Sequence, residues 1–165
     1  MQGLGARSWV LGVVALLLTA QPFAAADAAD DAVRTQLAGE WTLVKTDVFG
    51  DNGQVRPGNY DVGRIHYGER EMSAHLMRSG RVKEAPATEA ARAAAYQGYI
   101  GYFGPYTVDA ARKIVVHHVV GSSLPHWLGS EQVRYYSFTA DGLLTLSLKS
   151  GDRVTQTLTW KRTKG

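Results

Sequence analysis

The chain of 165 residues contains no cysteine. This excludes a disulfide framework, a thiolate nucleophile, a Cys-ligated metal site and the lipid-modified cysteine of a lipoprotein. No run of basic residues occurs, and the net charge is only +3 although the isoelectric point is about 9.2. The electrostatic pattern of proteins that bind nucleic acid or an anionic membrane surface is therefore missing.

The sequence also lacks the common catalytic fingerprints. There is no G-x-S-x-G, P-loop, H-E-x-x-H or Rossmann motif, and the five histidines do not have the spacing of metal ligands. We predict no cofactor, no metal and no assigned catalytic residue. A haem held by one histidine is the alternative.

The longest apolar run lies at residues 9–20, after the basic Arg7, and is too short to span a bilayer comfortably. Ala26 ends an A-x-A cleavage motif, and Ala28 ends a second one. We therefore predict a signal peptide at residues 1–26 and a periplasmic or secreted protein with no membrane span after cleavage. An uncleaved anchor is the alternative.

From residue 37 onward, short β-rich runs alternate with Gly, Asp, Asn and Ser, which is typical of an antiparallel sheet with tight turns. Asp141-Gly142 suits a hairpin, because this dipeptide readily adopts positive φ angles. The expected strands are Trp41–Phe49, Val62–Tyr67, Met72–Arg78, Tyr102–Asp109, Lys113–Val120, Gln132–Phe138, Leu143–Lys149 and Arg153–Arg162.

One helix is expected between the third and fourth strands. Thr88 can cap it, the Ala-rich run after Glu89 has high helix propensity, and the helix should end near Tyr99. An apolar stripe follows helical spacing over Tyr96, Tyr99, Ile100 and Phe103. We expect this stripe to pack against the sheet; a lid over an opening is the alternative.

Eight such strands predict an all-β fold, an eight-stranded antiparallel up-and-down barrel with one inserted helix, because closure removes exposed sheet edges. A two-sheet sandwich is the alternative. A barrel of this size is either filled by its own side chains or holds one small ligand. The expected organisation is a signal peptide at 1–26, a lead-in at 27–36 and one barrel domain at 37–165.

Several segments, in order, resemble the lipocalin-like domain family, a group of mostly bacterial barrels related to the calycins. They include LAGEWTLV at 37–44, MSAHLMR at 72–78, YFGPYTVD at 102–109, VHHV at 116–119, SLPHWLGSEQVR at 123–134 and LTWKR at 158–162. The resemblance implies a barrel but no particular reaction.

Gly39-Glu40-Trp41 is similar to the G-x-W signature of lipocalins, in which the tryptophan plugs the closed end of the barrel. In that signature an arginine from the last strand lies across the tryptophan ring, so the resemblance implies Arg162 as the partner of Trp41. We assign both residues a structural role.

Only alternate residues of a strand face a barrel interior, so one of His117 and His118 points inward. Alternation does not choose between them, whereas the resemblance favours His117 and marks Gln132 and Arg134. An inward arginine would need a carboxylate, a network of hydroxyls or an anionic ligand, because an unpaired buried charge is costly. The expected ligand-binding residues are Arg134, His117, Gln132, Tyr102, Tyr106 and Trp127.

These residues favour an exported barrel that binds a small hydrophobic or amphipathic molecule with an acidic or carbonyl head. One alternative is an isomerase or cyclase that uses His117 as acid or base and Arg134 to stabilise negative charge. Another is a filled barrel that serves as an interaction or stress module.

Overall fold

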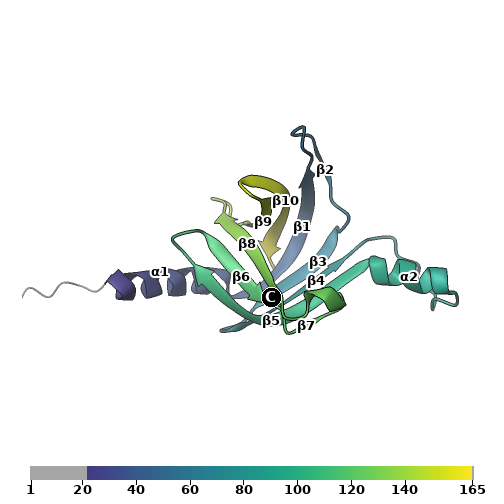
Figure 1. Ribbon diagram of the computed structural model, residues 1–165, viewed down its shortest axis with the longest axis horizontal. Coiled ribbons are helices and arrows are strands. Elements are labelled where there is room, and N and C mark those ends of the chain that lie inside the picture. The colour runs from purple at the N-terminus through teal and green to yellow at the C-terminus, as the bar shows by residue number, and fades with distance from the viewer. Residues whose placement is uncertain (1–21, 165) are drawn as a thin grey trace, which may run out of the picture.

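The computed structural model describes residues 22–164. Eight antiparallel strands form a closed barrel, in which each strand pairs with the next and β10 pairs with β1 (Figure 1). The barrel strands are β1 (Gly39–Phe49), β3 (Val62–Tyr67), β4 (Glu71–Met77), β5 (Tyr99–Asp109), β6 (Ile114–His118), β8 (Glu131–Phe138), β9 (Leu144–Ser150) and β10 (Arg153–Arg162). The predicted barrel is confirmed, and the sandwich alternative is wrong.

Two short strands add to this barrel. The strand β2 (Val55–Pro57) pairs with the end of β1, and β7 (Gly121–Ser122) pairs with β5. Gly104 lies where β5 changes its partner from β6 to β7, and a Cβ built there would clash with the His118 carbonyl oxygen. A glycine is required at this position because two backbones come too close for any side chain.

The turn chemistry explains the hairpin between β8 and β9. Gly142 has a φ of 81°, and its amide donates to the Thr139 carbonyl at 3.0 Å. A positive φ is strained for residues with a Cβ, so glycine allows the chain to reverse tightly here. The predicted Asp141-Gly142 turn is confirmed.

The end of the barrel at which β1 begins is closed by side chains. Trp41 and Leu37 are fully buried there, and the Trp41 and Phe138 ring centres are 6.3 Å apart. The guanidinium of Arg162 lies over the Trp41 ring at 4.3 Å, which confirms the expected pair. Both residues therefore serve the fold.

A helix that the sequence analysis did not expect, α1 (Pro22–Leu37), leads into this closed end. Arg162 donates hydrogen bonds to the carbonyls of Gln36 and Ala38, and the Asp30 carboxylate accepts one from the Ala110 amide. These contacts hold α1 against the barrel. The sequence analysis had interpreted most of this segment, residues 27–36, as a lead-in without assigned structure. The helix predicted between the third and fourth strands is a separate one, and α1 is an additional helix that was not predicted.

The predicted signal sequence falls largely outside the described residues, which begin at residue 22. The expected cleavage positions, Ala26 and Ala28, lie within α1. Among the described residues, no helix is both long and apolar enough to cross a membrane.

The second helix, α2 (Glu89–Gln97), lies between β4 and β5, at the opposite end of the molecule from α1 (Figure 1). The Thr88 hydroxyl accepts a hydrogen bond from the Ala91 amide, as the capping prediction requires. The predicted packing stripe is wrong, because α2 buries no residue and Tyr99, which begins β5, lies beyond its end. Gly98 and its neighbours end the helix before the stripe is complete.

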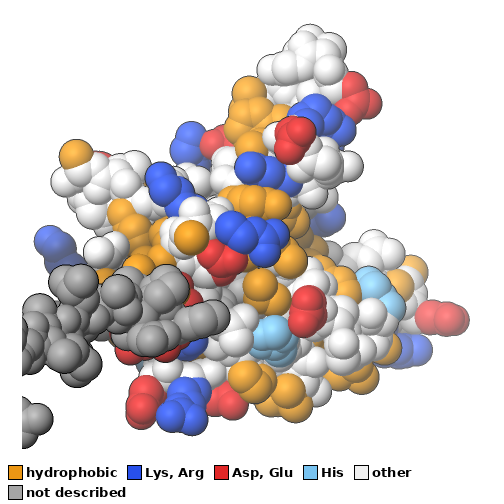
Figure 2. All heavy atoms as spheres, turned by 60° about the vertical axis from the view of Figure 1, so that its left-hand side comes forward, with side chains coloured by type: hydrophobic (Ala, Val, Ile, Leu, Met, Phe, Trp, Pro, Cys, Tyr) orange, Lys and Arg blue, Asp and Glu red, His pale blue; other side chains and the backbone are white. Residues whose placement is uncertain are grey.

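The surface carries charges of both signs. In Figure 2, basic and acidic side chains are interspersed over the visible face, without a continuous field of one sign. This distribution agrees with the small net charge of +3. The notable polar chemistry lies inside the barrel instead.

Candidate functional site

The barrel contains a cavity of about 140 Å³, whose lining begins at Ile65, the strand partner of Trp41, and includes Trp127 of the η1 segment. Its lining is mostly apolar and comes from six barrel strands and two connecting segments. The lining residues are Tyr60, Ile65, Ala74, Leu76, Ile100, Tyr102, Trp127, Arg134, Leu146, Leu148, Gln156, Leu158 and Trp160. A concave apolar site with a few convergent polar groups is typical of small-molecule binding sites.

Arg134, on β8, is the one cation in this lining, and only 8 % of its surface is exposed. Its guanidinium donates to the Val133 carbonyl at 2.9 Å and to Gln132 Oε1 at 3.3 Å. The ion pairs among the described residues do not include it. A buried charge held only by neutral acceptors is costly, so the site favours a negatively charged or strongly polar group beside it.

Gln132 does not line the cavity, yet it links Arg134 to the loop at the barrel opening. Its Nε2 donates to Ser130 Oγ at 3.0 Å, while its Oε1 accepts from Arg134. The Ser130 hydroxyl in turn donates to the Trp127 carbonyl at 2.7 Å. A chain of hydrogen bonds therefore runs from the guanidinium to the loop that carries Trp127.

Trp127 ends the short 3-10 helix η1 (Pro125–Trp127) and is half-buried at the cavity. Its ring lies edge-on to the Tyr102 ring, with centres 5.3 Å apart and planes at 75°. Edge-to-face pairs of this kind are favourable aromatic contacts. The indole thus forms part of the wall where the cavity approaches the surface.

His117, on β6, is completely buried, and the structure places it rather than His118 inside the barrel. Its Nε2 is hydrogen-bonded to the Tyr67 hydroxyl at 2.8 Å, and its Nδ1 to the Tyr102 hydroxyl at 3.0 Å. Burial, and then the positive charge of Arg134, lower the pKa of His117 well below 6.5. The imidazole is therefore neutral at physiological pH.

The two tyrosines that contact His117 are also protonated. Burial raises the pKa of Tyr67 well above 10 and raises that of Tyr102 as well, although the Arg134 charge opposes both effects. Tyr102 lines the cavity, whereas Tyr67 and His117 lie behind it. The site therefore presents a guanidinium and a phenol backed by a neutral imidazole.

Tyr106, like Gln132 and His117, is an expected site residue that does not line the cavity. Four residues along a strand correspond to about 13 Å, so Tyr106 shares the face of Tyr102 but lies much nearer the closed end. Its hydroxyl donates to the Gly68 carbonyl at 2.9 Å, and Arg34 of α1 lies over its ring at 5.3 Å. These contacts indicate a structural role.

Several lining residues were missed by the sequence analysis. Gln156, Leu158 and Trp160 alternate along β10 and face the cavity together. Alternation along the strand could have identified them. The indole Nε1 of Trp160 is buried and, among the described residues, has no hydrogen-bond partner.

Neither a metal nor a haem is favoured by these side chains. The described residues contain no group of three or more His, Asp or Glu side chains that could hold a metal ion. The interior histidine, His117, already uses both ring nitrogens for hydrogen bonds to tyrosines, so it could ligate an iron only by breaking one of them.

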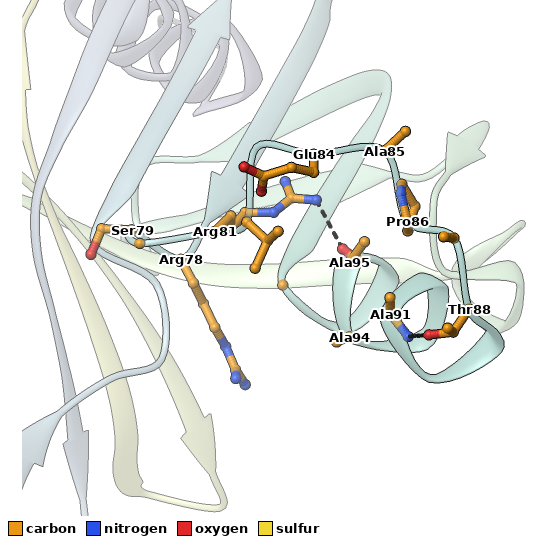
Figure 3. A pocket seen from close by; sticks show the side chains of 14 residues that line it. Arg78, Ser79, Arg81, Glu84, Ala85, Pro86, Thr88, Ala91, Ala94 and Ala95 are labelled. Atoms are coloured by element: carbon orange, nitrogen blue, oxygen red, sulfur yellow. Dashed lines mark hydrogen bonds between the residues drawn. The ribbon is translucent and has the colours of Figure 1, made fainter.

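A larger open cavity, of about 520 Å³, lies outside the barrel between α2 and the loop at residues 78–88 (Figure 3). Its walls are mainly exposed small side chains and backbone, and the Arg81 guanidinium is occupied by the Ala95 carbonyl at 3.0 Å. Such a surface offers little desolvated polar chemistry. The barrel cavity is therefore the better candidate site.

Comparison with known families agrees with this architecture. The lipocalin-like domain matches residues 38–163, which is most of the chain. The chain belongs to the lipocalin-like domain family. A search of curated proteins found no match for this lipocalin-like protein.

Two solved structures are similar to this lipocalin-like chain in fold alone. A lipocalin-like protein from Bacteroides uniformis shares 12 % identity at a TM-score of 0.47, covering 78 % of this chain and 99 % of its own. A redesigned β-barrel shares 11 % identity at a TM-score of 0.40, and the match covers 79 % of this chain and 95 % of the redesigned barrel.

Proposed function

We propose that this protein is an exported barrel that binds a small hydrophobic or amphipathic molecule with an acidic or carbonyl head. The observation that carries the proposal is Arg134, a buried guanidinium on the wall of an apolar cavity with no carboxylate partner among the described residues. A bound anion would supply the missing charge and strong acceptors in the low dielectric of the interior.

The cavity volume limits the size of the part that is enclosed. A cavity of about 150 Å³ in another protein accommodates benzene, and the present one measures about 140 Å³. A single aromatic ring or a short alkyl chain fits this space, with its head at Arg134. A longer ligand would extend past Trp127 toward the surface.

The other two hypotheses receive less support. Among the residues that the structure describes, those lining the cavity include no Asp, Glu or His, and the nitrogens of His117 are both occupied by tyrosines. General acid and base chemistry most often uses such a group within reach of the reacting atom. A filled barrel is disfavoured by the cavity, which is roughly five times the share of one water molecule in the liquid.

Ligand binding is tested with benzoate and its uncharged counterpart benzyl alcohol by isothermal titration. We expect the full mature protein to bind benzoate at least tenfold more tightly, and Arg134→Met to lose this preference. Arg112→Met, on the exposed surface, is the matched control and should behave as the wild type. Absence of binding of benzoate or hexanoate, together with no molecule co-purifying in native mass spectrometry of host-derived protein, would overturn the proposal.

Export is tested separately, because it rests on the sequence before residue 27. The full-length gene product is expressed with a C-terminal tag. Its measured mass is expected to match a chain whose first residue is Asp27 or Ala29. Recovery of the intact chain from the cell interior contradicts export while leaving ligand binding in place.

A further inference from the structure

The hydroxyls of Tyr67 and Tyr102 and the imidazole of His117 form one continuous chain that ends at the cavity. Tyr67 is 1 % exposed, and its hydroxyl has one hydrogen-bond partner among the described residues, His117 Nε2. The Tyr102 hydroxyl is hydrogen-bonded to His117 Nδ1 and lies within reach of the Arg134 guanidinium, and Tyr102 also lines the cavity. The two ends of the chain therefore differ in their access to a further acceptor.

This difference determines the tautomer of the imidazole. A neutral imidazole donates from one nitrogen and accepts at the other. If Nε2 carried the hydrogen, Tyr67 would accept it and its own hydroxyl hydrogen would be left unpaired in the core. If Nδ1 carries the hydrogen, Tyr67 donates to Nε2, and the one hydrogen without a protein acceptor is that of Tyr102, which borders the cavity; this is the favoured arrangement.

With the hydrogen on Nδ1, His117 donates to the Tyr102 oxygen. The hydroxyl hydrogen of Tyr102 then has no protein acceptor in this chain, and the nearby Arg134 is purely a donor. The remaining direction for this hydrogen is the cavity. The chain therefore converts a phenol that could either donate or accept into a donor.

We propose that Tyr67 and His117 hold the hydroxyl of Tyr102 as a donor toward the cavity, where Tyr102 and Arg134 together bind the carboxylate of a small monocarboxylic acid. This inference rests on the proposed function and specifies its ligand class. Tyr102 contacts the ligand, and Tyr67 and His117 are positioning residues that act through it.

The cavity presents two hydrogen-bond donors, Arg134 and the Tyr102 hydroxyl, and no matching acceptor beside them. This arrangement also determines which ligands the site selects. A carboxylate offers two acceptor oxygens and a charge, so it satisfies Arg134 and Tyr102 at once. An alcohol or a primary amide of the same size carries O–H or N–H groups of its own. These groups would find no hydrogen-bond acceptor at Arg134 and Tyr102. The site should therefore select benzoate over both benzyl alcohol and benzamide.

The tautomer is tested first, without any ligand. Long-range ¹H–¹⁵N correlation spectra of the full mature protein at pH 7 are expected to show His117 protonated at Nδ1, with His117→Gln used for assignment. In Tyr67→Phe, the Nε2 resonance should shift toward that of a nitrogen without a hydrogen bond, because the hydroxyl that donates to it has been removed. Protonation at Nε2 in the wild-type protein overturns the inference and leaves the proposed function standing.

The role of Tyr102 is tested by titration with benzoate. Tyr102→Phe should weaken binding about tenfold or more, the effect of removing one hydrogen bond to a charged group. Tyr135→Phe, on the outer face of β8, is the control and should bind as the wild type. Unchanged affinity in Tyr102→Phe overturns this inference alone, whereas a wild-type protein that binds no small carboxylate overturns the proposed function and this ligand class together.

Discussion

The guanidinium of Arg162 lies 4.3 Å from the centre of the Trp41 ring and also donates to the carbonyls of Gln36 and Ala38, at 2.7 and 2.6 Å. One side chain thus covers the tryptophan plug and satisfies carbonyls at the end of α1. Such carbonyls have no partner within their own helix and are stabilised by a nearby cation.

Arg162→Ala should therefore destabilise the fold. The lost cation–π contact and two hydrogen bonds correspond to about 2 kcal/mol of unfolding free energy, measured by urea denaturation. Arg162→Lys should recover part of this loss, because lysine keeps the charge but not the planar fork. Lys161→Ala, at the adjacent exposed position, is the control; equal stability of all three variants contradicts this role.

The docking of α1 should contribute to stability as strongly as a core element. Leu37 has no exposed surface, so Leu37→Ala is expected to cost about 2–4 kcal/mol. Gln36→Ala changes an exposed side chain of the same turn and should cost far less. Thermal and urea unfolding measure the loss of unfolding free energy in each variant. Equal losses in Leu37→Ala and Gln36→Ala would show that α1 does not unfold cooperatively with the barrel.

Gln132→Glu should inhibit carboxylate binding without removing Arg134. The new carboxylate would replace the Oε1 that Arg134 already contacts at 3.3 Å, so the guanidinium would gain an internal counter-ion. We expect benzoate affinity to fall at least tenfold by isothermal titration. Glu131→Gln, on the exposed neighbouring position, is the control, and benzoate binding to Gln132→Glu at wild-type strength would be the contrary result.

The depressed pKa of His117 predicts acid sensitivity. Below the unfolded pKa of about 6.5, the unfolded chain takes up a proton at this residue, whereas the folded chain keeps it neutral. Stability should therefore fall as the pH drops below 6.5, until the lower folded pKa is reached. The limiting slope is about 1.4 kcal/mol per pH unit for one proton.

Urea unfolding of the wild type and His117→Gln at pH 7.5 and pH 5 measures this effect. The variant is less stable at pH 7.5 because it loses the tyrosine contacts, but it should lack this part of the pH dependence. The same loss of stability between the two pH values in both proteins would show that His117 is not the group responsible.

Much of the barrel was predictable because its strands carry local signals. The bounds of β3 and β10 agree with the predicted ones, and the others differ by a few residues at their ends. The Asp141-Gly142 turn and the Trp41–Arg162 pair were also predicted. These features depend on turn chemistry, on alternation and on a short signature, all of which are visible in a few consecutive residues.

The helices were predicted less well, because tertiary contacts decide where each one lies and ends. The Ala-rich segment of α1 resembles a cleavage region, and its docking depends on Arg162, more than a hundred residues away. The apolar stripe assigned to α2 continues into β5, where pairing with β4 imposes a strand. Local propensity is a weak guide at such junctions.

For the site, the sequence by itself determined which residues share a strand face, and so that His117 and His118 point to opposite sides. The tertiary structure decided that His117 faces inward between Tyr67 and Tyr102, that Tyr106 lies away from the cavity, and that Arg134 is buried without a carboxylate. The physical reason is that hydrogen-bond partners and charges come from strands distant in sequence, and alternation along one strand carries no information about what the others place opposite it.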